Sequence, residues 1–197
     1  MSHRVIAGTA KGRKLRLVPD KGVRPIMDRV KEALFNILGI SVRAAHFLDL
    51  FAGTGAVGIE ALSRGAAYAR FLDNNKLSIQ VINDNLTHTQ LAERGEVLLT
   101  DSLAYLKRKA TATFDFVFIA PPQYKGIWKA ALTALDENPT HLNPDALVIV
   151  QIDPSEYEDL SLENLDLYDE RRYGNTMLLF LEYITEDDEE EDEDPAD

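Results

Sequence analysis

The sequence predicts an α/β protein with a doubly wound, mostly parallel sheet, and three observations support this. Strand-like and helix-like segments alternate from residue 46 to residue 151, the order that builds parallel βαβ units. An apolar run at 46–50 breaks into small residues at 52–56 and then resumes as a helical pattern. Two strand-like runs between residues 165 and 183, separated near Gly174, predict an antiparallel hairpin that closes the sheet.

The individual elements follow from apolar periodicity and from the residues that interrupt it. In chain order, strands are expected at residues 46–50, 68–73, 96–100, 114–119 and 146–151. The run at 114–119 is very apolar, which predicts a central strand buried on both faces. Helices are expected after the 52–56 turn and at residues 29–38, 75–87, 102–109 and 128–135. Ahead of them, residues 4–7 and 13–18 are predicted as two strands of a hairpin whose turn contains Gly8 and Gly12.

Length and composition restrict the class of protein. A chain of 197 residues can form one α/β domain with a small appendage. No apolar run approaches the ~20 residues that span a bilayer, and the N-terminus lacks the apolar core of a secretory signal. There is no Cys, which excludes disulfides and thiolate metal sites. We therefore expect a cytoplasmic protein without membrane contact or bound metal.

Charge is strongly segregated along the chain. Residues 1–31 contain nine Lys or Arg against two Asp, whereas residues 186–197 contain ten acids and no base. A basic head is typical of nucleic-acid binding, although an exposed sheet edge also uses charge to avoid aggregation. The tail is expected to be disordered, as a solubilising segment or, alternatively, as an RNA mimic that competes for the head. The candidate RNA-binding residues are Arg4, Lys11, Arg13, Lys14, Arg16, Arg24 and Arg29.

These features divide the chain into three parts. Residues 1–25 are predicted to be a basic N-terminal β-hairpin extension, residues 26–185 the main α/β domain, and residues 186–197 the acidic tail.

Candidate ligand-binding residues gather where successive strands end. Gly53-Thr-Gly-Ala-Val-Gly58 fits G-x-G-x-x-G after a strand and before a helix, the geometry that holds a ligand against backbone N–H groups. Asp73 lies 20 residues beyond Gly53, where an acid can bind both ribose hydroxyls of an adenosine.

Asp49 separates the two cofactor classes that share this spacing. A carboxylate directly before the glycine turn would repel a pyrophosphate, whereas it suits an ammonium group. Asp101 can accept a hydrogen bond from an adenine amine. The pattern therefore favours S-adenosylmethionine over a dinucleotide. The candidate cofactor-binding residues are Asp49, Phe51, Ala52, Gly53, Thr54, Gly55, Asp73, Asn74, Asp101, Ser102 and Leu103.

Three motifs together resemble the RsmD family. They are Asp49-Leu-Phe-Ala-Gly-Thr-Gly-Ala-Val-Gly-Ile-Glu-Ala-Leu-Ser-Arg-Gly-Ala66, the pair Arg4-Val-Ile-Ala-Gly and Gly12-Arg-Lys-Leu, and Arg24-Pro-Ile-Met-Asp-Arg-Val. The likeness extends from about residue 4 to residue 183. It implies a Rossmann-like class I methyltransferase fold with a seven-stranded sheet and methyl transfer from S-adenosylmethionine to the N2 amine of a guanine in 16S ribosomal RNA. The implied partner is 16S rRNA or a small-subunit assembly intermediate, and the implied active unit is a monomer.

The motif after the fourth strand departs from the usual pattern. Families that methylate exocyclic amines usually carry Asp, Asn or Ser before Pro-Pro and an aromatic, and the polar side chain accepts a hydrogen bond from the amine. This chain has Ala120-Pro121-Pro122-Gln123, with the aromatic displaced to Tyr124. We expect backbone carbonyls of Ala120 and Pro121 and the Gln123 amide to be the acceptors, and Tyr124 to stack on the flipped base. These five residues, Ala120 to Tyr124, are the candidate catalytic set.

Other functions stay open at the level of sequence. One is an NAD(P)-dependent oxidoreductase, since the glycine motif and the Asp73 spacing occur in both classes. A second is a non-catalytic RNA-binding or assembly factor that has lost the acceptor at Ala120. A third keeps the methyltransferase but changes its target to DNA adenine or to a protein Gln or Asn side chain.

Overall fold

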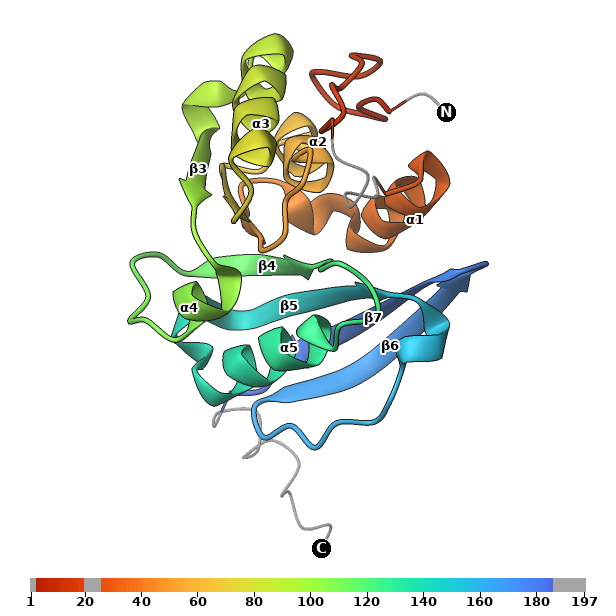
Figure 1. Ribbon diagram of the computed structural model, residues 1–197, viewed down its shortest axis with the longest axis vertical. Coiled ribbons are helices and arrows are strands. Elements are labelled where there is room, and N and C mark those ends of the chain that lie inside the picture. The colour runs from red at the N-terminus through yellow and green to blue at the C-terminus, as the bar shows by residue number, and fades with distance from the viewer. Residues whose placement is uncertain (1–2, 20–25, 186–197) are drawn as a thin grey trace, which may run out of the picture.

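The computed structural model describes residues 3–19 and 26–185 and contains the predicted seven-stranded sheet. The strand order is β3-β2-β1-β4-β5-β7-β6, and Figure 1 labels β3 and the strands β4 to β7. The strands are β1 His46–Asp49, β2 Tyr68–Asp73, β3 Gly95–Leu99, β4 Phe114–Ile119, β5 Leu142–Ile152, β6 Leu165–Tyr173 and β7 Thr176–Tyr183. The α-helices are α1 Asp28–Leu38, α2 Ala56–Arg64, α3 Lys76–Thr89, α4 Ser102–Leu106 and α5 Ile127–Glu137. Four short 3-10 turns are η1 Gly39–Val42, η2 Ala92–Arg94, η3 Pro139–His141 and η4 Pro154–Glu156.

The pairing of the strands confirms the predicted topology. Strands β1 to β5 pair in parallel, and β7 runs antiparallel to both β5 and β6. The apolar strand β4 lies between β1 and β5, in the centre of the sheet, as predicted. Several elements differ in length from expectation; among them, α4 ends at Leu106, and β5 begins at Leu142, four residues before the predicted start. Lys107 to Lys109 therefore follow α4 as exposed residues.

Two apolar cores lie on the two faces of the sheet, because side chains alternate along each strand. Helices α1, α2 and α3 cover one face and α4 and α5 cover the other (Figure 1). In β4, Phe116 and Phe118 belong to the first core, whereas Val117 and Ile119 belong to the second. This alternation determines which face of the sheet each side chain of a strand points to.

The glycines between β1 and α2 are required for two reasons, backbone conformation and close packing. Gly53 and Gly55 have positive φ angles of 54° and 75°, which glycine adopts without steric penalty. Gly58 lies inside α2, where a Cβ atom would come within 2.3 Å of the Phe71 ring on β2. The third glycine of the motif thus allows the helix to lie close against the sheet.

The N-terminal segment is not the two-stranded hairpin that the sequence predicts. Residues 4–7 and 13–18 run antiparallel, but they share a single bridge, Arg4 to Lys14, and form no strand. The reason is competition for backbone N–H groups. Glu60 of α2 accepts from the N–H groups of Ile6 and Ala7 at 2.8 and 2.9 Å, and Asn85 of α3 accepts from Arg16 N–H at 2.8 Å. The segment therefore pairs with itself only around this bridge, through the N–H groups of Val5, Gly12 and Leu15, and elsewhere docks on α2 and α3.

A buried ion pair anchors this segment. Glu60 and Lys31 are both fully buried, with 3.3 Å between Lys31 Nζ and Glu60 Oε2. Lys31 Nζ also donates to the carbonyl of Arg4 at 2.7 Å, and Arg64 Nε lies 2.9 Å from Glu60 Oε1. Burial lowers the pKa of Lys31, and the nearby Glu60 carboxylate opposes that shift. Neither residue was singled out in the sequence, because an acid and a base 29 positions apart give no local signal.

Candidate active site

The carboxyl ends of the parallel strands surround a cavity of about 690 Å³. Among its lining residues are all five of the predicted catalytic turn, Ala120 to Tyr124. Ten of the predicted cofactor residues also line it: Asp49, Phe51, Ala52, Gly53, Thr54, Asp73, Asn74, Asp101, Ser102 and Leu103. Gly55 does not line it; as the residue preceding α2, it shapes the turn. One cavity thus unites two groups of residues that the sequence places about 70 positions apart.

Asp49 is the most unusual charge in this cavity. Its side chain is buried, and Oδ2 accepts from Gly58 N–H at 3.3 Å. Burial raises the pKa of Asp49 from its ordinary 3.8 to about 7; the Gly58 hydrogen bond opposes this rise and the charge of Asp73 adds to it. A carboxyl held in this way gains from a cationic partner, because a nearby positive charge restores the ionised form.

Asp73 supports the glycine turn directly. Its Oδ2 accepts from Gly53 N–H at 2.9 Å, and its Oδ1 accepts from Asn75 N–H at 2.8 Å. Each carboxylate oxygen keeps a further lone pair that can accept from a ligand hydroxyl. Asp73 therefore both shapes the loop and offers acceptors at the cavity wall.

Asp101 and Ser102 are fixed by local contacts at the start of α4. Asp101 caps the helix, its Oδ1 accepting from Ala104 N–H at 2.8 Å. Ser102 is buried, and its hydroxyl donates to the carbonyl of Leu50 beside β1. These contacts hold the α4 end of the cavity in place next to the glycine turn.

The Pro-Pro turn presents Tyr124 to solvent in an uncommon conformation. Tyr124 has a φ of 61° and its side chain is 66% exposed. Two carboxylates of the segment after β5 hold it: Tyr124 O–H donates to Asp153 at 2.9 Å, and its N–H donates to Glu156 at 2.7 Å. Sequence reasoning missed both acids, although Asp153-Pro-Ser is a recognisable cap for the 3-10 turn that follows.

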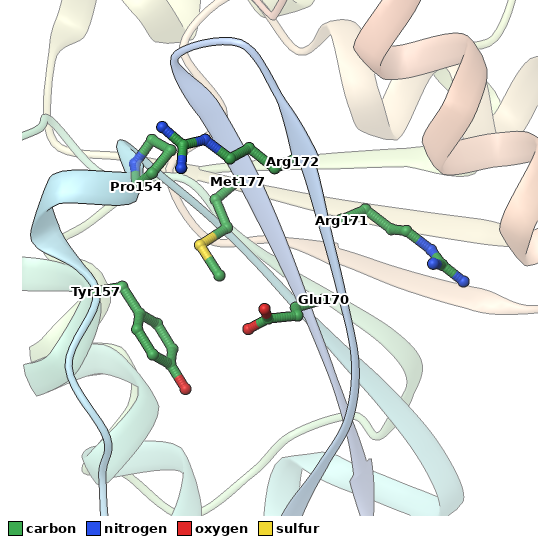
Figure 2. Close-up of a pocket in the computed structure, with 6 residues that line it drawn as sticks. All are labelled: Pro154, Tyr157, Glu170, Arg171, Arg172 and Met177. Carbon is green, nitrogen blue, oxygen red and sulfur yellow. The ribbon is translucent and has the colours of Figure 1, made fainter.

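A smaller cavity of about 310 Å³ lies between the segment after β5 and the hairpin of β6 and β7 (Figure 2). It is lined by Pro154, Tyr157, Glu170, Arg171, Arg172 and Met177. Arg172 reaches toward Pro154, whereas Arg171 extends away from it, as alternation along β6 requires (Figure 2). Hydrogen bonds from Ser155 and Tyr124 lower the pKa of Asp153, and the charge of Arg172 adds to that shift. Arg172 is thus an exposed cation close to Asp153, whereas Arg171 pairs with Asp169 at 3.0 Å; the sequence analysis listed neither arginine.

The candidate RNA-binding residues are in different situations. Arg13 donates to the carbonyl of His88 and to Gln90, so that its charge is used within the fold. Arg16 pairs with Asp84 at 2.7 Å, and Arg4 lies 3.5 Å from Asp28. Lys11, Lys14 and Arg29 are exposed. Arg24 lies outside the described residues, as does the tail 186–197.

The N-terminal segment also touches the glycine turn, which sequence reasoning did not foresee. His3 Nε2 lies 2.8 Å from the hydroxyl of Thr54, and burial lowers the pKa of His3 to about 4. Asn85 is fully buried and donates both to the carbonyl of Thr54 at 2.9 Å and to that of Arg16 at 3.2 Å. The predicted extension, 1–25, is therefore hydrogen-bonded to the turn through its described part.

Two absences concern the described residues alone. Within residues 3–19 and 26–185, no group of three or more His, Asp or Glu is arranged to hold a metal ion. In the same ranges no helix is long and apolar enough to cross a membrane.

Comparison with known proteins places the chain in a family. The family model described as "Conserved hypothetical protein 95" matches residues 3–182. The chain is 38% identical to Ribosomal RNA small subunit methyltransferase D of Haemophilus influenzae, over 87% of this chain and 89% of the relative. The protein of the same name from Escherichia coli is 37% identical over 75% and 73%. The solved structure of Escherichia coli yhhF is similar, with a TM-score of 0.83 and 32% identity over 93% of this chain and 98% of that one. The chain thus belongs to the RsmD family, as its motifs predict.

Proposed function

We propose that this protein transfers a methyl group from S-adenosylmethionine to the exocyclic N2 amine of a guanine in 16S ribosomal RNA. One observation carries the proposal: a single cavity joins the glycine turn and its acids to the Pro-Pro turn. The relatives named Ribosomal RNA small subunit methyltransferase D support the choice of substrate. The proposal includes a cytoplasmic location, a monomeric active unit, and 16S rRNA or a small-subunit assembly intermediate as partner.

The residues around the glycine turn fit S-adenosylmethionine. Asp49 would hold the ammonium of its amino acid part, since a buried carboxyl with a raised pKa gains from a cation. Asp73 would hold the ribose hydroxyls, and the α4 end of the cavity, at Asp101 to Leu103, would hold the adenine. When bound, the cofactor supplies an already activated methyl group.

The protein's part in the reaction is placement. The lone pair of guanine N2 forms the new N–C bond while the C–S bond breaks, its electron pair stays on sulfur, and one N2 proton leaves to water. A base must leave its stack to be reached, and the exposed ring of Tyr124 offers a surface on which it can stack. Asp153 holds the phenol group and Glu156 holds the backbone of Tyr124, so that the target lies near the Pro-Pro turn. Lys11, Lys14 and Arg29 are exposed cations that can contact RNA phosphates.

Methyl transfer to defined nucleotides tests this function. Protein, tritiated S-adenosylmethionine and either protein-free 16S rRNA or small-subunit particles should yield labelled N2-methylguanine, mapped to one position. Label in adenine or in protein would contradict the guanine proposal. RNA binding without turnover would favour a non-catalytic factor, which the alanine at position 120 makes the second candidate.

Cofactor affinity is expected to depend on pH through Asp49. Because the pKa of Asp49 is about 7 in the unliganded protein, the ionised fraction rises about tenfold from about pH 6 to about pH 8. Affinity for S-adenosylhomocysteine, measured by calorimetry, should rise accordingly, with proton release near neutral pH. The Asp49→Asn variant keeps only the titration of the ligand's own amine. Equal pH profiles for the two proteins would contradict the role of Asp49.

The raised pKa of Asp49 also makes the free energy of unfolding depend on pH. A carboxyl whose pKa is raised by folding favours the folded state while it is protonated. The contribution of Asp49 to the stability of the unliganded protein should therefore fall as the pH rises from about 4 to about 7, and the difference in free energy of unfolding between the wild type and the Asp49→Asn variant should show that fall.

A further inference from the structure

Gln151 near the end of β5 has an acceptor that the described protein does not satisfy. Its Oε1 atom is buried and has no hydrogen-bond partner among the described residues. Buried amide oxygens are nearly always paired, and an exception at a ligand cavity points to a ligand that completes the pair. Gln151 is one of the residues that line the 690 Å³ cavity. The unpaired acceptor therefore belongs to a residue of the candidate active site.

The sheet register places Gln151 next to Ala120. Ile119 of β4 pairs with Val150 of β5, so the following residues of the two parallel strands, Ala120 and Gln151, are neighbours. Phe118 and Ile149, two positions earlier, lie in the same core, which puts Ala120 and Gln151 on that same face. Adjacent strands are about 4.8 Å apart, a distance that the longer Gln side chain can span.

These positions suggest a replacement of one acceptor by another. Ala120 stands where amine methyltransferases usually carry an Asp, Asn or Ser that accepts from the target amine, and an alanine side chain cannot accept. Gln151 carries an amide acceptor on the neighbouring strand, at the same face and cavity. Tyr124 also lines this cavity and is largely exposed, so a base stacked on its ring can direct its amine inward.

We propose that Gln151 is the catalytic residue that accepts a hydrogen bond from the exocyclic amine of the target base, in place of the side chain missing at Ala120. The bond uses one N2 hydrogen and leaves the nitrogen lone pair directed at the methyl group. An amide does not take up the proton, which leaves to water after the new N–C bond has formed. This role rests on the proposed methyltransferase function and names a residue that the sequence analysis did not select.

The test compares single-turnover methylation of small-subunit particles by the full chain and three variants. Gln151→Leu keeps the side-chain size and removes the amide, in a position that borders the apolar core. We expect its rate to fall about 100-fold, the loss typical of one oriented polar contact to a reacting group, with unchanged affinity for S-adenosylhomocysteine. Gln80→Leu, the same change on the exposed side of α3, should keep the wild-type rate.

A second substitution separates catalysis from folding. Adding Ala120→Asn to Gln151→Leu returns an amide to the same cavity from the neighbouring strand, and it should restore at least about tenfold of the lost rate. A purely structural role for Gln151 predicts no such rescue. A Gln151→Leu rate within about threefold of the wild type, or a loss that Ala120→Asn does not relieve, overturns the inference alone. A wild type that methylates no RNA overturns the proposed function and this inference with it.

Discussion

Replacing Glu60 with leucine is expected to lower the free energy of unfolding by about 3–5 kcal/mol, because it leaves Lys31 as an uncompensated buried charge. It also removes the acceptor of two backbone N–H groups, at Ile6 and Ala7, and so weakens the attachment of the N-terminal segment to α2. Urea unfolding followed by circular dichroism measures the effect. A loss below about 1 kcal/mol would contradict this account of the anchor.

Two control variants make that result specific. Glu32→Leu changes an exposed acid on α1, next to Lys31 in sequence, and should alter stability by less than about 0.5 kcal/mol. Lys31→Met together with Glu60→Leu removes both buried charges and should destabilise less than Glu60→Leu alone. The difference between the single and double variants measures the cost of the unpaired lysine.

Replacing Asp73 with alanine is expected to weaken the binding of S-adenosylhomocysteine by about 100-fold or more. Hydrogen bonds to a charged acceptor contribute about 1.5–3 kcal/mol each, and each 1.4 kcal/mol is about tenfold in affinity. The substitution removes the proposed ribose acceptors and also the acceptor of Gly53 N–H, which shapes the loop. Calorimetric titration without RNA gives the affinity.

Asp115 provides a matched control at the amino ends of the parallel strands, on the side of the sheet opposite the carboxyl ends that surround the cavity. It too accepts from a backbone N–H, that of His46 at 2.7 Å, and from the Asn143 amide at 2.7 Å. Asp115→Ala should therefore cost comparable stability while leaving cofactor affinity unchanged. If Asp73→Ala binds the ligand no worse than Asp115→Ala, the ribose does not bind at Asp73.

The described part of the chain also shows how closely the N-terminal segment is joined to the domain. The sequence predicts residues 1–25 as a separate extension, yet His3 contacts Thr54 in the glycine turn and Asn85 bonds both Thr54 and Arg16. The N–H groups of Ile6, Ala7 and Arg16 donate to side chains of α2 and α3. We therefore propose that RNA bound by this segment lies next to the glycine turn.

The sequence by itself determined the strands, the parallel character of the sheet and the strand-end residues, because apolar periodicity, glycine turns and caps act over a few residues. The fold class and the family prediction are confirmed. Local patterns also brought Asp49, Asp73 and the Pro-Pro turn to one edge, since parallel strands all end there.

Only the tertiary structure decided the contacts between distant segments. The Lys31–Glu60 pair, the hold of Asp153 and Glu156 on Tyr124, and the place of Gln151 beside Ala120 each join residues about 29 to 32 positions apart. The physical reason is that burial and register, rather than residue type, determine them. Gln151 is a single glutamine on an apolar strand, and its residue type alone does not indicate a function. Its proposed role depends on the strand register, which places it beside Ala120.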